Sequence, residues 1–103
     1  MKKILISALV AVGLSVSLSA DQSEIGQRVY LQAFADSCGM NGTKFAAQHS
    51  QIEWQEILED GLFETRMIEI CGGNIEAVPQ RFIPALFDFV YKFANDSGNV
   101  PSC

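Results

Sequence analysis

The chain has 103 residues, which is enough for one domain with a hydrophobic core but not for two. It carries seven basic and twelve acidic residues, so its formal net charge is −5. A surface with this excess of negative charge repels nucleic acids and anionic lipids, so the composition argues against both as partners.

The first 20 residues have the features of a Sec-type signal peptide. Lys2 and Lys3 precede an apolar run over residues 4–16, and the small residues before and including Ala20 offer a cleavage site. We therefore expect a mature domain of residues 21–103 in the periplasm, with no stable membrane insertion. An uncleaved anchor is the alternative, although the run is short for a span of about 20 residues. Cleavage would leave five basic and twelve acidic residues, a net charge of −7.

The stretch from Gly26 to Gly42 predicts an amphipathic helix that ends in a turn. Apolar residues at helical spacing form its expected inner face: Ile25, Val29, Tyr30, Ala33 and Phe34. Ser23 is the expected N-cap, and Gly39 together with Gly42 is expected to end the helix. A connector is expected over residues 43–49.

Three further helices are expected, and there is no strand pattern. Ser50 and Glu53 match a capping box, which predicts a helix from there to Gly61. This helix turns Trp54, Ile57 and Leu58 inward and a row of acidic residues toward solvent: Glu53, Glu56, Glu59 and Asp60.

The next expected helix runs over residues 62–70, with Phe63, Met67 and Ile70 inward, and ends at Gly72 and Gly73. A connector over residues 74–79 leads to the last helix, for which Pro79 or Pro84 would occupy the first turn. The inward residues of this last helix follow i, i+3, i+4, i+7 spacing: Leu86, Phe89, Val90 and Phe93. The sequence thus predicts an all-α domain of about four short helices.

The three cysteines are Cys38, Cys71 and Cys103. An exported protein meets an oxidising compartment, so one disulfide is expected. We favour Cys38–Cys71 because both cysteines lie at turns that end helices; Cys103 is the alternative partner of Cys71. The remaining cysteine would stay free or pair with another chain. No C-x-x-C is present, so a thioredoxin-type redox site is not expected.

The first helix and its turn resemble a small class I cytochrome c, whose pattern is G-x-x-x-Y-x-x-x-C-x-x-C-H-G-x-x-G. The glycines and the tyrosine of this pattern are present: Gly26, Tyr30, Gly39 and Gly42. The haem-binding residues are replaced, because Phe34 and Ser37 stand at the two haem-linking cysteines and Cys38 stands at the axial histidine. The segments around Thr43 (G-x-x-F-A-A) and Trp54 (E-W), and the tail D-S-G-N-V-P-S-C, also resemble small exported bacterial proteins labelled cytochrome c-like.

The resemblance implies an all-α fold whose first and last helices cross closely, with Gly26 allowing an aromatic residue of the last helix to approach. The family transfers single electrons through haem. Here the covalent motif is missing, and so is a methionine ligand in the connector before the last helix. We therefore expect a haem-free, disulfide-stapled accessory or interaction module whose partner is a periplasmic redox or respiratory protein. Bulky residues would fill the haem space: Phe34, Phe45, Trp54, Phe63 and Phe82.

The alternative is an electron carrier with non-covalent haem ligated by His49, with Met67, Met40 or Cys38 opposite. Without haem, His49 would be a solvated residue before the capping box, and Met67 would be a core residue. The two hypotheses differ in whether His49 faces a cavity or Phe34 and Trp54 occupy it.

Neither enzymatic nor metal-binding chemistry is favoured. Cys38 with His49 is the only thiol–imidazole pair, and no third group is marked to orient it. Cys38, His49, Cys71 and Cys103 would be a legitimate zinc ligand set, but their spacing matches no close-spaced knuckle and a disulfide competes for the thiols. We therefore expect no enzyme activity, no catalytic residues and no metal site.

Overall fold

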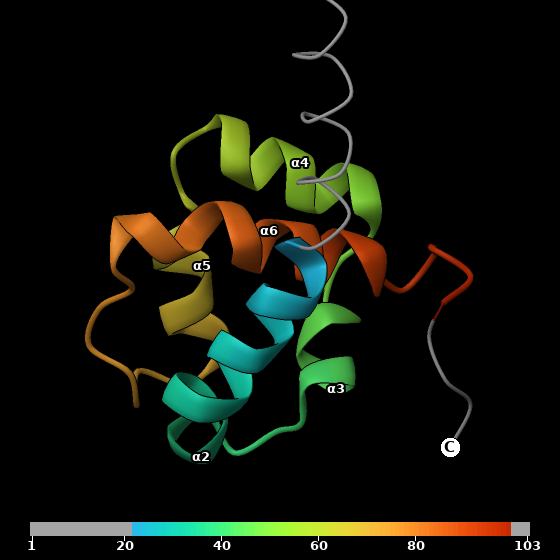
Figure 1. Ribbon diagram of the computed structural model, residues 1–103. Helices are drawn as coiled ribbons and strands as arrows, with labels where there is room; N and C mark the ends of the chain where they lie inside the picture. Colours follow the sequence, from blue (N-terminus) through green and yellow to red (C-terminus); the bar gives the residue numbers. More distant parts are fainter. Residues whose placement is uncertain (1–21, 100–103) are drawn as a thin grey trace, which may run out of the picture.

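Helices make up the regular structure of residues 22–99, the part of the chain that this computed structural model describes (Figure 1). In chain order they are a helical stretch at 22–29, the π-helical η1 (Tyr30–Phe34), α2 (Ala35–Cys38), α3 (Gly42–Ala46), α4 (Gln51–Glu59), α5 (Phe63–Ile70), the 3₁₀ turn η2 (Gln80–Phe82) and α6 (Ile83–Lys92). No strand occurs in this range, so the all-α prediction is confirmed. The signal-peptide prediction for residues 1–20 and the alternative disulfide partner Cys103 lie outside the described residues.

The first helix runs without a break from residue 22 through η1 to the end of α2. It ends at Gly39, which has a left-handed φ of 76°, as predicted. The expected N-cap is wrong: Ser23 lies inside the helix, since residue 22 is already helical, and its side chain is buried.

The inner face of the first helix also differs from the prediction. Tyr30 and Phe34 are buried as expected, but Ala33 is exposed and Ile25 keeps 47% of its surface accessible. The residue that faces the core in place of Ile25 is Gly26, because α6 crosses the helix at this point and leaves no room for a side chain.

α6 is the central helix, packed against α3, α4 and η2, and crossed by the first helix (Figure 1). A Cβ atom on Gly26 would overlap the carbonyl group of Ala85 and lie 2.9 Å from Cβ of Phe89. The first helix and α6 therefore touch backbone to backbone. Pro84 lies in the first turn of α6, where its missing N–H is not needed.

The prediction of a connector over residues 43–49 is wrong in its first half, because residues up to Ala46 belong to the helix α3. The Asn41 side chain caps this helix, with Oδ1 accepting a hydrogen bond of 2.8 Å from the backbone N–H of Lys44. Burial of Phe45 and Ala46 then holds the short helix against the core. Gly42, expected to stop a helix, begins this one and lies against the ring of Phe89.

The capping box of α4 is confirmed. Ser50 Oγ accepts from the N–H of Glu53 at 3.2 Å, and the Glu53 carboxylate accepts from the N–H of Ser50 at 2.9 Å. Gly61 follows the helix with a φ of 75°, which favours glycine. Gly72 and Gly73 have positive φ after α5 in the same way, as the sequence predicted.

Candidate functional site

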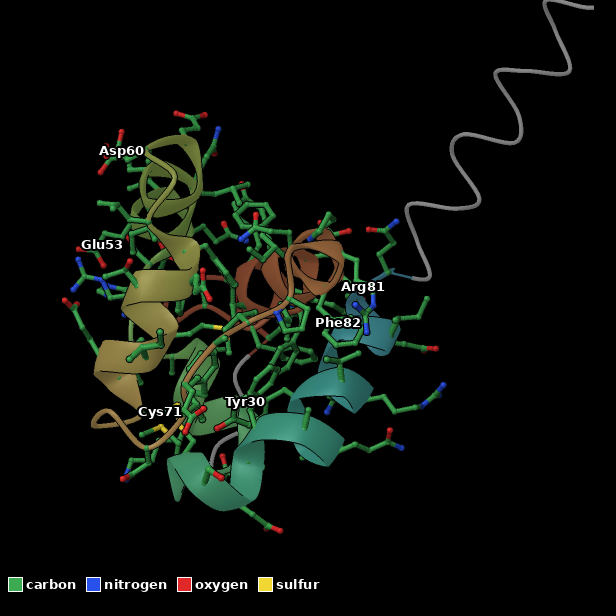
Figure 2. The ribbon with its side chains drawn as sticks, turned by 90° about the vertical axis from the view of Figure 1, so that its left-hand side faces the viewer. Tyr30, Glu53, Asp60, Cys71, Arg81 and Phe82 are labelled. Carbon is green, nitrogen blue, oxygen red and sulfur yellow. A yellow bond between two sulfur atoms is a disulfide. The ribbon has the colours of Figure 1, made fainter. Side chains whose placement is uncertain are left out.

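The expected disulfide between Cys38 and Cys71 is present. Cys38 ends α2 and Cys71 follows α5, so the bridge joins the ends of two helices through cysteines that are 33 residues apart in the sequence. Both cysteines are buried, and the yellow sulfur atoms are visible near the Cys71 label in Figure 2. A cysteine held in a disulfide has no thiol with which to attack a substrate or bind a metal.

A chain of aromatic rings occupies the centre of the domain. Tyr30 stacks on Phe45 at 4.7 Å between ring centroids, Phe45 lies 5.9 Å from Trp54, and Trp54 lies 5.7 Å from Phe63. The Trp54 indole N–H donates to the carbonyl of Ala46 at 2.8 Å. All four rings are buried and belong to one hydrophobic core.

Phe34 and Ser37, which the resemblance aligns with the two haem-linking cysteines of cytochrome c, have different surroundings. Phe34 is buried in the core, whereas Ser37 is exposed. Both border an open groove of about 430 Å³ whose other wall is the connector over residues 74–77. Of the five bulky residues expected in the interior, four are buried and Phe82 is only partly buried. The buried ones are Phe34, Phe45, Trp54 and Phe63.

His49 lies at the surface, just before α4. Its Nδ1 is 3.3 Å from Oε1 of Glu53, and its ring is nearly perpendicular to that of Trp54, with ring centroids 4.9 Å apart. The side chain keeps 22% of its surface accessible. The backbone carbonyl of His49 accepts from the N–H of Asn95, which fixes this segment to the end of α6.

An open hollow of about 300 Å³ lies between α4 and the first half of α5; we call it the α4 groove. Its lining residues are His49, Glu53, Glu56, Ile57, Asp60, Leu62 and Arg66. Glu53 and Asp60 lie along the same side of the molecule (Figure 2). Three carboxylates and one guanidinium give this hollow a negative charge.

The sequence placed the acidic residues of α4 on the solvent side but did not show the groove. Two of its lining residues, Leu62 and Arg66, come from the next turn and helix, so the hollow forms only when α5 folds back on α4. The spacing of Glu53, Glu56 and Asp60, at i, i+3 and i+7, was the available signal, because it places three carboxylates along one face.

Met67 is fully buried in the core and is not among the residues that line the α4 groove. A haem needs a wide apolar slot with axial ligands directed into it. The ring-filled centre and the carboxylate-lined groove beside His49 do not fit a haem held between His49 and Met67. That ligand pair stays a sequence prediction. Within residues 22–99, no group of three or more His, Cys, Asp or Glu side chains is placed to hold a metal ion.

No family model, curated protein or solved structure matches the chain. Among the helices of residues 22–99, none has the length and apolar character needed to cross a bilayer.

Proposed function

We propose that the chain is an exported, cytochrome c-like protein that works without haem, as an accessory or interaction module beside a periplasmic redox or respiratory protein. The observation that carries this proposal is what occupies the positions of the haem-attachment motif. Phe34, at a haem-linking position, is a core residue, and Cys38, at the axial-ligand position, is bonded to Cys71.

Loss of a central cofactor must be compensated, because an unfilled cavity destabilises a fold in proportion to its volume. The buried rings of Phe34, Phe45 and Trp54 supply that volume. The Cys38–Cys71 bridge adds covalent stability to a mature domain of 83 residues, a size at which small domains gain much from such a link. The buried rings and the disulfide together favour a scaffold that is stable without a cofactor.

The helix crossing supports the cytochrome c-like part of the proposal. The resemblance implied that Gly26 would let the last helix approach the first, and Gly26 meets Ala85 and Phe89 of α6 without space for a Cβ atom. Tyr30, the other matched residue of this helix, lies 6.0 Å from the Phe89 ring. A close crossing of the first and last helices at a glycine is what the resemblance implies for the scaffold.

The rival proposal is an electron carrier with non-covalent haem on His49. The observation in its favour is that His49 borders the α4 groove and keeps one imidazole nitrogen, Nε2, without a hydrogen bond among the described residues. Imidazole nitrogen is a common ligand of haem iron. The two proposals predict opposite absorption spectra.

The deciding experiment is an absorption spectrum of the protein purified from the periplasm of a host competent in cytochrome c maturation, before and after dithionite. We expect only the aromatic protein band, and no Soret band after added haemin is removed by gel filtration. A Soret band that sharpens into α and β bands on reduction, and that is lost in His49→Gln, would establish the rival. A band that persists in His49→Gln would show haem at another position and would contradict both proposals.

A further inference from the structure

The α4 groove combines negative charge with two apolar lining residues, Ile57 and Leu62. We propose that it binds a lysine or arginine side chain presented by a basic partner protein. This inference rests on the proposed interaction role and adds the place and chemistry of the contact.

Two of the carboxylates in the groove have no partner among the described residues. Glu56 and Asp60 make no ion pair and no side-chain hydrogen bond within residues 22–99. Glu53 is engaged by His49 and by the N–H of Ser50. Glu56 lies in the last turn of α4, and Asp60, four residues later, is the C-cap of this helix, so a single cation can approach both carboxylates.

Arg66 does not neutralise these carboxylates. Its guanidinium is 3.3 Å from the carboxylate of Glu69, its neighbour on α5, and its buried Nε has no hydrogen-bond acceptor. The lining residues include three carboxylates and only one guanidinium. The described residues thus leave an excess of negative charge for an incoming cation.

The apolar lining residues of the groove indicate what kind of cation fits. Ile57, which is buried, and Leu62, which keeps 45% of its surface exposed, both line the groove. Lysine and arginine carry an aliphatic stem that packs on such surface while the charged end reaches polar groups. A bare metal ion gains nothing from these contacts, and no three-ligand metal group occurs in the described range.

The partner is expected to be basic because the groove belongs to an acidic protein. Arg81 lies on the side of the molecule away from Glu53 and Asp60, where it stacks on the ring of Phe82 at 4.6 Å (Figure 2). The face around the groove is therefore not screened by that cation. A basic partner would be steered to this face, and a second copy of this acidic chain would be repelled.

The test uses the ¹⁵N-labelled chain and the peptide acetyl-pentalysine amide as probe, followed by NMR amide shifts at about 50 mM salt, where the screening length is still above 10 Å. We expect saturable shifts centred on residues 56–62. The double variant Glu56→Gln/Asp60→Asn should weaken binding by about three- to tenfold, the effect of losing two exposed charge contacts.

The matched control is Glu24→Gln/Glu76→Gln, which changes the net charge equally at two exposed carboxylates outside the groove. We expect it to weaken binding by less than about twofold, since remote exposed charges are largely screened. Equal weakening by the two double variants would show general attraction to an acidic surface and would overturn the inference. So would shifts that centre elsewhere, or concentration-dependent shifts of residues 56–62 without peptide, which would indicate self-association.

The outcome is separable from that of the proposed function. A haem spectrum would overturn the haem-free proposal whether or not the peptide binds. A haem-free chain that does not bind the peptide in its α4 groove would overturn only the present inference.

Discussion

Gly26 and Ala85 are in contact through their backbones, and a Cβ atom on Gly26 would overlap the carbonyl oxygen of Ala85. The obstacle is backbone rather than a side chain that could rotate away. The closeness of the first helix to α6 therefore depends on the absence of a side chain at this one position.

Gly26→Ala is expected to lower the free energy of unfolding by about 2–3 kcal/mol, as overpacking does in a tight core. The substitution would otherwise favour the helix, because alanine has the higher helix propensity by about 1 kcal/mol. Urea unfolding followed by circular dichroism measures the net effect. A variant as stable as the parent would show that the two helices can separate without loss.

Gly42→Ala is the matched control for this prediction. Its Cβ would come within 2.9 Å of Cζ of Phe89, which is the far end of a side chain and can shift. We therefore expect a smaller loss, under about 1 kcal/mol. If the two variants were destabilised equally, crowding at α6 in general would explain the result, and the backbone contact of Gly26 would have no special role.

The Cys38–Cys71 bridge is expected to contribute about 3–4 kcal/mol, the chain-entropy estimate for closing a loop of 33 residues. The double variant Cys38→Ser/Cys71→Ser should unfold at correspondingly lower urea concentration. Added reductant should destabilise the parent to the same level and leave the double variant unchanged. Peptide mass mapping of the oxidised parent checks the pairing, and a different pairing would contradict the structure.

Local signals account for what the sequence predicted correctly. The capping box at Ser50 and Glu53 lies within four residues, and the glycine that ends α4, Gly61, acts through its own backbone conformation. Such features depend little on the rest of the fold. The pairing of Cys38 with Cys71 was also expected, from their positions at helix-ending turns, although Cys103 could not be set aside from spacing alone.

Tertiary contacts account for the features that the sequence did not predict. Ile25 was expected to face inward because it is apolar, but the crossing of α6 selects Gly26 for that face. α3 is only one turn and a half long, and burial of Phe45 stabilises it more than its sequence pattern does. The α4 groove needs Arg66 from another helix, so no segment shows it when considered alone.

Tyr30 is expected to make the stability fall at alkaline pH. Burial raises the pKa of its hydroxyl to about 12, because the phenolate would lose its hydration, whereas an unfolded tyrosine ionises near 10. The unfolded state therefore loses its proton first, so the stability is complete below about pH 10 and declines as the pH rises toward about 12. Phenolate absorbance of the folded protein should show one tyrosine that ionises late.

Tyr30→Phe is the variant that isolates this effect. It loses the hydrogen bond of 2.8 Å to the carbonyl of Met40, which should lower the stability at neutral pH by about 1 kcal/mol. It cannot ionise, so the difference from the parent should shrink as the pH rises above about 10. A difference that stays constant with pH would mean that Tyr30 ionises alike in both states.

The capping box of α4 gives a prediction with the opposite pH dependence. The pKa of Glu53 is lowered, first by the hydrogen bond from the N–H of Ser50 and then by His49. The charged form is favoured in the fold, so its contribution is present above the unfolded pKa and is lost as the pH falls through the lower folded one. Glu53→Gln should be less stable than the parent at neutral pH and should approach it on acidification.

Two variants separate the cap from the charge. Ser50→Ala removes the acceptor for the Glu53 N–H and should lower the stability by about 1 kcal/mol. Glu59→Gln removes a carboxylate at the C-terminal end of α4, where a negative charge opposes the helix dipole, so its stability should stay equal or rise. Thermal unfolding followed at several pH values measures the stability of Glu53→Gln, Ser50→Ala and Glu59→Gln. If Glu53→Gln behaved like Glu59→Gln, the carboxylate of Glu53 would be only one of several surface charges, and Ser50 alone would cap the helix.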